Sequence, residues 1–343
     1  MRFDSAAVEG PYLRDILAQP QALAETVAGL SAAPALPRFS GVDRVILTGM
    51  GASFHALHPL AIRLAAHGYC AAAYETSELI HYYAGALSPR TLVIAVSQSG
   101  RSVEIVRLLD TAPQGMRIIG VTNTPDSPLA TRADHTVMTR AGAEYSVSTK
   151  TFVTILLALE WLGAALCGGD RRAAENTLCE AAPAAAQYLA GWETKVASLA
   201  ALFDGVRALF VTGRGSSLAA AGTGGLILKE SAHFHAEGMT CSAFRHGPFE
   251  MSGPGAYLLA FAGDAETAPL NENLVRDVRA AGGKAALIGP QSDVDAFRIP
   301  ETAPAVRPVL EMLPLQLTSL AIAALAGHAP GQFQLLTKVT TIE

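Results

Sequence analysis

The feature that most constrains the fold is a strand–turn–helix pattern that occurs twice in the chain. VILTGMGAS at 45–53 corresponds to LFVTGRGSS at 209–217, and TLVIAVS at 91–97 corresponds to AYLLAFA at 256–262. SELIH and SAFRH form a further matching pair at a nearly constant spacing. Unbroken apolar runs of this length are typical of strands buried on both faces of a parallel sheet. The repeat predicts an α/β protein with two tandem modules.

The chain divides into four expected parts. Residues 1–40 predict a helical entry segment, because apolar side chains recur at helical spacing until prolines interrupt them. The first module is expected over 41–170 and the second over 205–343 with its C-terminal tail. Alanine-rich, charge-dotted residues 171–204 predict long helices that join the two modules.

Within the first module, strands and helices alternate. A single helix is expected over 53–67, and a second, buried helix over 152–166, because that apolar run is too long for a strand. Strands are expected at 45–47, 71–75, 92–96, 116–121 and 135–138.

Composition restricts the class of protein. Half of the 343 residues are hydrophobic and 16% are charged, which favours a well-packed enzyme over a disordered chain. A net charge of −5 and a pI near 6.0 argue against nucleic acid or an anionic membrane as a partner.

The cysteines and the hydropathy pattern indicate a cytoplasmic protein. The four cysteines contain no CxxC pair, so we expect free thiols in a reducing compartment. The N-terminus shows no apolar signal segment, and no window offers the roughly 18 uncharged apolar residues of a membrane span.

The turn after the strand at 91–96 is the first candidate site. Ser97, Gln98, Ser99 and Gly100 lead into a helical pattern that begins near Ser102. Free backbone N–H groups and the positive end of a helix dipole favour a phosphate there, and serine hydroxyls add donors. The alternative is an ordinary polar βα turn. The second copy has Ala262-Gly263-Asp264 instead, which indicates one main ligand site for each pair of modules.

Other motifs are weaker. Gly49-Met50-Gly51, with Glu75 after the next strand, could begin a dinucleotide fingerprint, but Phe54 stands where the third glycine belongs. His233 and His235 invite a metal interpretation, but no further ligand set is evident, so packing or hydrogen bonding is favoured.

Three further residues could carry chemistry. A glutamate such as Glu230 could shuttle a proton in an enclosed site, although a solvated Lys–Glu pair is the usual alternative. His246 precedes Gly-Pro, which fixes a turn and leaves the imidazole on a loop. Lys338, near the end of the sequence, is from composition alone a solvated lysine.

Taken together, these motifs resemble the sugar isomerase (SIS) superfamily, specifically the two-SIS isomerase half of glucosamine-6-phosphate synthase (glutamine–fructose-6-phosphate aminotransferase). The resemblance runs from about Tyr12 to Glu343 and rests on these segments: GASFHA, SQSGRS, GVTNTPDSPLA, AGAEYSVSTKTF, LKESAHFHAEG, RHGP and LLTKVTTIE. It implies two tandem SIS modules, each a flavodoxin-like parallel sheet flanked by helices.

The resemblance also implies roles for individual residues. Glu230 would move a proton between C1 and C2, His246 would open the sugar ring across a homodimer, and Lys338 would form a Schiff base with the open-chain ketose. A second set of residues would bind the phosphate and line the sugar: Ser53, Ser97, Gln98, Ser99, Ser102 and Val147.

Two departures from the synthase pattern stand out. No glutaminase segment with a nucleophilic cysteine precedes the entry helix, so we expect that glutamine is not the nitrogen source. The family's additional active-site lysine falls on Ile227. Stand-alone SIS proteins of this layout resemble glucosamine-6-phosphate deaminases.

The resulting expectation is a cytoplasmic, homodimeric enzyme that acts on a 6-phosphosugar without a metal or redox cofactor. Glucosamine-6-phosphate deaminase is the favoured activity. The alternatives are another phosphosugar specificity (isomerase, galactosamine-phosphate deaminase or fructosamine-phosphate deglycase) and a non-catalytic phosphosugar sensor.

Overall fold

The computed structural model describes residues 5–37, 39–335 and 337–338, which form two compact units. The β1–β5 unit contains the described residues of Gln21–Ala143, Lys150–Cys179 and Leu335–Glu343. The β6–β9 unit contains those of Met1–Pro20, Glu144–Thr149 and Glu180–Gln334. The two units therefore alternate along the chain.

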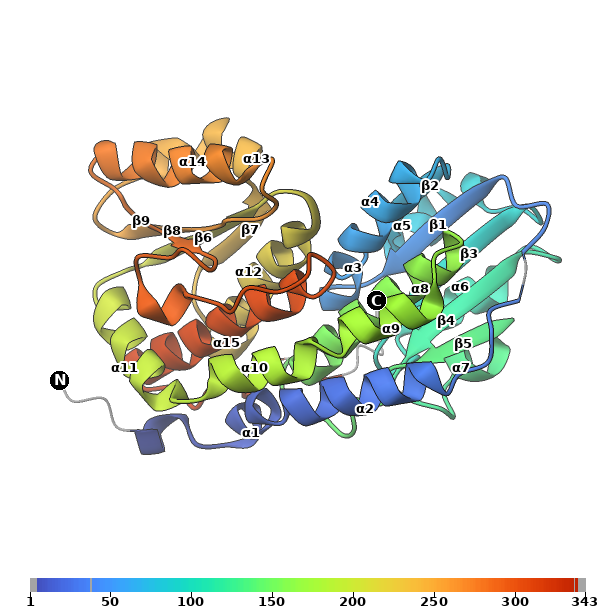
Figure 1. Ribbon diagram of the computed structural model, residues 1–343, viewed down its shortest axis with the longest axis horizontal. Helices are drawn as coiled ribbons and strands as arrows, with labels where there is room; N and C mark the ends of the chain where they lie inside the picture. The colour runs from blue at the N-terminus through green and yellow to red at the C-terminus, as the bar shows by residue number, and fades with distance from the viewer. Residues whose placement is uncertain (1–4, 38, 336, 339–343) are drawn as a thin grey trace. The chain divides into compact units, whose positions relative to one another are not determined.

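The β1–β5 unit is built on a five-stranded parallel sheet with the order β2-β1-β3-β4-β5 (Figure 1). This is the flavodoxin-like order, and it confirms the predicted parallel sheet. The central strand β3 is buried at all six positions, as its unbroken apolar run predicts. The strands are β1 (Arg44–Gly49), β2 (Ala71–Glu75), β3 (Thr91–Val96), β4 (Arg117–Thr122) and β5 (His135–Met138).

Helices cover both faces of this sheet. On one face, Ile46 and Val93 pack against Leu79, Leu108 and Leu129, which come from three different helices. The long helix α8 is buried along most of its length, which explains why it is apolar all round. The helices of the unit are α2 (Gln19–Ser31), α3 (Ala52–His55), α4 (His58–Ala66), α5 (Thr76–His81), α6 (Val103–Thr111), α7 (Pro128–Arg132), α8 (Lys150–Leu166) and α9 (Arg171–Leu178), with a 3-10 turn η2 (Ala84–Ala86).

The β6–β9 unit repeats this architecture with four parallel strands in the order β7-β6-β8-β9. The first four strands of the other sheet have the same order, so the repeat seen in the sequence is a structural repeat. Side chains bind two carbonyls of the edge strand β9: Arg279 Nε donates to Ala285 O at 2.8 Å, and Ser292 Oγ to Leu287 O at 2.6 Å. The strands are β6 (Ala208–Gly213), β7 (Ala236–Thr240), β8 (Ala256–Phe261) and β9 (Lys284–Ile288).

The core of this unit lies on both faces of the sheet. Phe210 and Leu258 pack against Phe244, Leu274 and Val278 on one face. On the other side, α12 contacts β6 and α15. The helices are α1 (Pro11–Leu17), α10 (Ala181–Leu189), α11 (Trp192–Phe203), α12 (Leu218–Ala232), α13 (Cys241–Arg245), α14 (Ala268–Ala280) and α15 (Arg307–Leu325). The 3-10 turns are η1 (Ser5–Val8), η3 (Gly215–Ser217), η4 (Pro248–Met251) and η5 (Asp295–Phe297).

Two helical predictions were wrong in detail. The expected single helix over 53–67 is two helices, α3 and α4, because Pro59 stands in the first turn of α4, where its missing N–H costs nothing. The expected long helices over 171–204 are three short ones. The first begins where the Asp170 side chain accepts from the N–H groups of Arg172 and Ala173, and the third follows Gly191, which has a φ of 69°.

One helix bears on the expectation that no window offers a membrane span of uncharged apolar residues. Helix α15 is long and apolar enough to cross a bilayer by length and composition alone. However, 89% of its apolar window is buried inside the protein, as in the core helix of a globular domain.

Candidate functional site

The turn between β3 and α6 has the geometry of an anion cradle. Ser97 is buried, and the Gly100 N–H lies 3.1 Å from its Oγ. Gly100 has a φ of 60°, and a Cβ there would lie 2.2 Å from Ser127 Oγ. Glycine is therefore required for both conformation and space. Ser97 Oγ accepts from Gly100, so its own O–H can still be donated to a ligand.

Strand β4 braces this turn from one side. The N–H of Asn123 and the Oγ1 of Thr122 both donate to Gln98 O at 3.1 Å. Ser97 N donates to Val121 O at 3.0 Å. These bonds fix the backbone of the turn, so the serine hydroxyls project from a rigid support.

Helix α6 begins directly after the turn. Its N-cap is Ser102, whose side chain makes no capping hydrogen bond within the described part of the chain. The Ser102 side chain therefore does not occupy the first N–H groups of this nine-residue helix. Together with the helix dipole, they favour an anion beside Ser99 and Ser102, both half-buried.

Ser53 lies at the same edge of the sheet. It belongs to α3, which follows β1, and β1 pairs directly with β3. Because the carboxyl ends of parallel neighbours meet at one edge, the structure brings Ser53, Ser97, Gln98, Ser99 and Ser102 to one region of the β1–β5 unit. Lys338 is half-buried and belongs to the same unit.

The other predicted site residues belong to the β6–β9 unit. Glu230 lies in the last turn of α12 and is half-buried, while His246 is exposed at the C-terminal end of α13. Val147 is buried, with 1% of its surface exposed. The expected site thus draws residues from both units, and its assembly from them stays a prediction.

Ile227 explains one departure from the family pattern. It is fully buried in α12, and its carbonyl accepts from Ser231 Oγ at 2.6 Å. A lysine at this position would place an ammonium group among apolar side chains, at a high desolvation cost. The position therefore serves packing in this protein.

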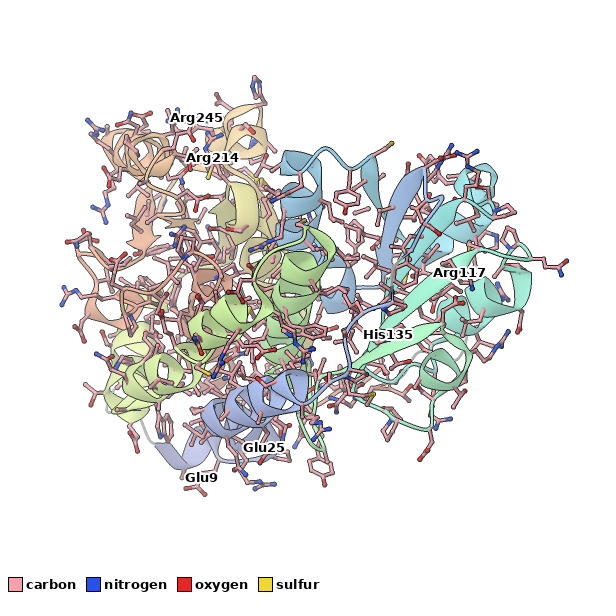
Figure 2. All side chains as sticks on the ribbon, turned by 45° about the vertical axis from the view of Figure 1, so that its right-hand side comes forward. Glu9, Glu25, Arg117, His135, Arg214 and Arg245 are labelled. Atoms are coloured by element: carbon pink, nitrogen blue, oxygen red, sulfur yellow. The ribbon has the colours of Figure 1, made fainter. Side chains whose placement is uncertain are left out.

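The second module has a carboxylate where the first has its serine cradle. Asp264 follows β8 and pairs with Arg307, with Oδ1 and Nη1 2.5 Å apart. Beside it, Arg214 Nε donates to Asn271 Oδ1 at 3.0 Å; Figure 2 labels Arg214. Asp264 places a negative charge at the position where a phosphate would bind. It also already forms an ion pair with the guanidinium of Arg307. The chemical difference between the two copies is therefore built into their folds.

Glu311 is a buried acid that the sequence analysis missed. Its Oε1 accepts from Ser217 Oγ at 2.8 Å, and its Oε2 has no hydrogen-bond partner among the described residues. Burial raises the pKa of Glu311 to about 7; the Ser217 hydrogen bond and the Arg307 charge oppose this, and Asp264 adds to it. A lone acid within the apolar run of α15 was the signal available in the sequence.

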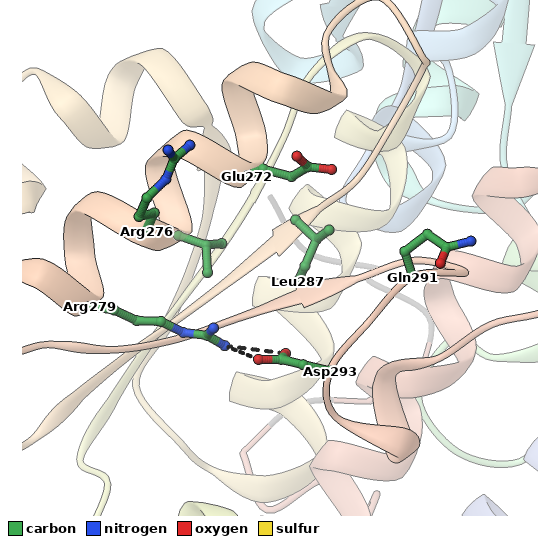
Figure 3. A pocket seen from close by; sticks show the side chains of 7 residues that line it. Glu272, Arg276, Arg279, Leu287, Gln291 and Asp293 are labelled. Atoms are coloured by element: carbon green, nitrogen blue, oxygen red, sulfur yellow. Dashed lines mark hydrogen bonds and ion pairs between the residues drawn. The ribbon is translucent and has the colours of Figure 1, made fainter.

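A cavity of about 270 Å³ lies between α14 and the segment after β9 (Figure 3). Arg279 and Asp293 form an ion pair at its wall, with 2.9 Å between Nη2 and Oδ2. Other lining side chains include Glu272, Arg276 and Gln291. No sequence motif marks these residues, and both acidic and basic side chains line the cavity.

Comparisons with known proteins agree with this architecture. The family model described as SIS domain matches residues 38–165 and 203–326. A glutamine–fructose-6-phosphate aminotransferase (isomerizing) from Pyrococcus horikoshii is 31% identical over 346 aligned residues, which cover 96% of this chain and 57% of that protein. The chain therefore spans little more than half the length of this curated relative.

Solved structures show the same fold. The glucosamine-6-phosphate deaminase from Thermotoga maritima matches with a TM-score of 0.80 and 18% identity, covering 97% of this chain and 100% of that one. The tagatose-6-phosphate ketose/aldose isomerase from Escherichia coli matches with a TM-score of 0.79 and 18% identity, covering 95% of both chains.

Proposed function

The chain belongs to the SIS-domain family, and from this premise we propose that it converts glucosamine 6-phosphate and water to fructose 6-phosphate and ammonia. The observation that carries the proposal is the serine turn between β3 and α6, with its glycine-dependent backbone and its helix N-terminus. The relatives named above act, by their names, on hexose or amino-sugar 6-phosphates.

In this proposal the phosphate binds at the β3–α6 turn. The hydroxyls of Ser97, Ser99 and Ser102 donate to its oxygens, with Gln98 beside them. The N–H groups of the first turn of α6 supply the remaining donors. Ser53 and Val147 line the sugar. This arrangement selects for a 6-phosphate and leaves the other end of the sugar for the chemistry.

Glu230 carries out the proton transfer. Its carboxylate removes the proton from C2 of the open-chain amino aldose. The electron pair forms the C1–C2 double bond of an enolamine as the C1–O π pair moves to O1, which takes up a proton that the nitrogen later releases. Return of the proton to C1 gives the imine at C2. Water then adds to C2, the C–N bond breaks, and ammonia leaves as the C2 carbonyl forms. A positioned carboxylate typically supplies about 10²–10⁴ in rate for such a step.

Two other residues assist. His246 of the partner subunit opens the pyranose ring in a homodimer, by moving a proton to the ring oxygen as the C1–O5 bond breaks. In the reverse direction, the Lys338 Nζ adds to C2 of the open-chain ketose product with loss of water and forms a Schiff base. The positions of both residues support these roles, because His246 directly follows α13 and Lys338 lies in the segment after α15.

The test is a panel of 6-phosphosugars with the purified chain. Ammonia and fructose 6-phosphate are measured separately by coupled assays. We expect equal amounts of the two products from glucosamine 6-phosphate, with no effect of added glutamine. Glutamine-dependent synthesis would identify an aminotransferase instead. Binding of phosphosugars without turnover of any of them would identify a sensor.

A further inference from the structure

Gly331 lies where three elements of the β6–β9 unit meet. Its N–H donates to Ser231 O at 2.9 Å, directly beside Glu230 at the end of α12. Its carbonyl accepts from Ser146 Oγ at 2.6 Å. A Cβ at this position would lie 2.1 Å from Ser146 Oγ and 2.7 Å from Tyr12 Cβ, and φ is 74°. Both backbone groups and the Cα of Gly331 are therefore fixed.

Helix α1 anchors this meeting point to the core. Tyr12 is fully buried, and its hydroxyl lies 2.8 Å from Ser319 Oγ in α15. Burial raises the pKa of Tyr12 above its ordinary value; the hydrogen bonds with Ser319 and Ser231 oppose this, and the charges of Glu230 and Glu144 add to it. The phenol stays protonated and stays a hydrogen-bonding group near these carboxyls.

The segment Glu144–Thr149 is held just as firmly. The Tyr145 N–H donates to Asp15 Oδ2 in α1 at 3.0 Å. Glu144 Oε1 accepts from both the N–H and the Oγ1 of Thr149 at 2.9 Å, which closes the segment on itself. Ser146 therefore reaches Gly331 from a rigid loop that also carries Val147.

We propose a positioning joint formed by Tyr12, Ser146, Ser231 and Gly331. The segment that leads to Lys338 starts at Gly331, and the joint holds this residue against the end of α12, which bears Glu230. The described residues after α15 form neither helix nor strand, so regular structure does not hold this segment. The inference rests on the proposed roles of Glu230 and Lys338. A displacement of about 1 Å in reacting groups can cost about 10² in rate.

Ser146→Ala tests the joint, and Ser292→Ala is its matched control. Ser292 Oγ also donates to a backbone carbonyl at 2.6 Å, that of Leu287, and both serines are buried. We expect kcat of the Ser146 variant to fall about tenfold or more, with KM changed less than twofold. Borohydride trapping of fructose 6-phosphate on Lys338, measured by mass spectrometry, should fall in parallel. The control should retain kcat and trapping.

Amide hydrogen exchange separates failure of the joint from failure of the proposed function. Peptides covering 331–338 should exchange faster in the Ser146 variant than in wild type or the Ser292 variant. Equal exchange, or equal kcat in both variants, would overturn the joint. Inactivity of wild type on every phosphosugar would overturn the function but not the exchange result. If the Ser146 variant does not fold, Tyr12→Phe removes only the hydroxyl and must meet the same criteria.

Discussion

Replacing Glu311 with glutamine should change how stability depends on pH. The folded state holds this carboxyl at a pKa of about 7, against an ordinary value of 4.5. The folded protein therefore binds a proton between these pH values that the unfolded chain releases. Stability from this group is full below pH 4.5, and it is lost as the pH rises through 7.

The magnitude follows from the difference in pKa. A difference of about 2.5 units, at 1.36 kcal/mol per unit, corresponds to roughly 3 kcal/mol of lost stability between pH 5 and pH 8. Glutamine keeps an oxygen that can accept from Ser217 but has no charge to bury. The variant should match wild type below pH 4.5 and become more stable than wild type by about this amount at pH 8.

Denaturant unfolding at several pH values between 5 and 8 measures this directly. Glu250→Gln serves as the control, because Glu250 is exposed in a 3-10 turn of the same unit. The control should follow the wild-type curve within a few tenths of a kcal/mol, as exposed substitutions usually do. Parallel curves for wild type and the Glu311 variant would refute the buried, proton-binding carboxyl.

Three predictions address the proposed chemistry. Ser97→Ala and Ser99→Ala should each weaken phosphosugar binding at least tenfold in isothermal titration, since a donor to a charged oxygen contributes about 1.5–3 kcal/mol. Ser88→Ala, at the opposite end of β3, should bind normally, and equal affinity in all three variants would contradict the cradle. Glu230→Gln should bind substrate but lose about 10² or more in turnover, together with C2 proton exchange in deuterated solvent. Mixing the Glu230→Gln protein with the His246→Ala protein should restore activity, because one site of each mixed dimer keeps both residues. If activity does not recover after proven subunit exchange, Glu230 and His246 of one site come from the same chain.

The fold was predictable where one element carries its own signal. The unbroken apolar run of β3 and the repeat at 45–53 and 209–217 identified parallel strands and a duplicated module. The break between α3 and α4 was visible only as Pro59, whose effect depends on its position within the turn. In the second sheet, the side chains of Arg279 and Ser292 donate to β9 carbonyls, and such tertiary contacts leave no local pattern in the sequence.

The same distinction applies to the candidate site. The β3–α6 turn is local, so Ser97, Ser99 and Gly100 could be selected from the sequence on physical grounds. Glu230 and Lys338 were indistinguishable from surface charges until a family resemblance gave them roles. Gly331 illustrates the reason. Its backbone makes two hydrogen bonds, with Ser231 and Ser146, which lie far away in the sequence, so no local pattern marks this glycine.

The two modules differ chemically at the turn where we expect the ligand. Both sheets end in a tight turn at the same edge, after β3 and after β8, and both turns contain a glycine with positive φ. What differs is the side chains of the two turns: Ser97 and Ser99 offer hydroxyl donors in one copy, and Asp264 pairs with Arg307 in the other. Because Asp264 already pairs with Arg307 within the protein, the second turn needs no external anion to neutralise this arginine. The first turn offers hydroxyl and N–H donors to an external anion, and we therefore expect one phosphosugar for each chain.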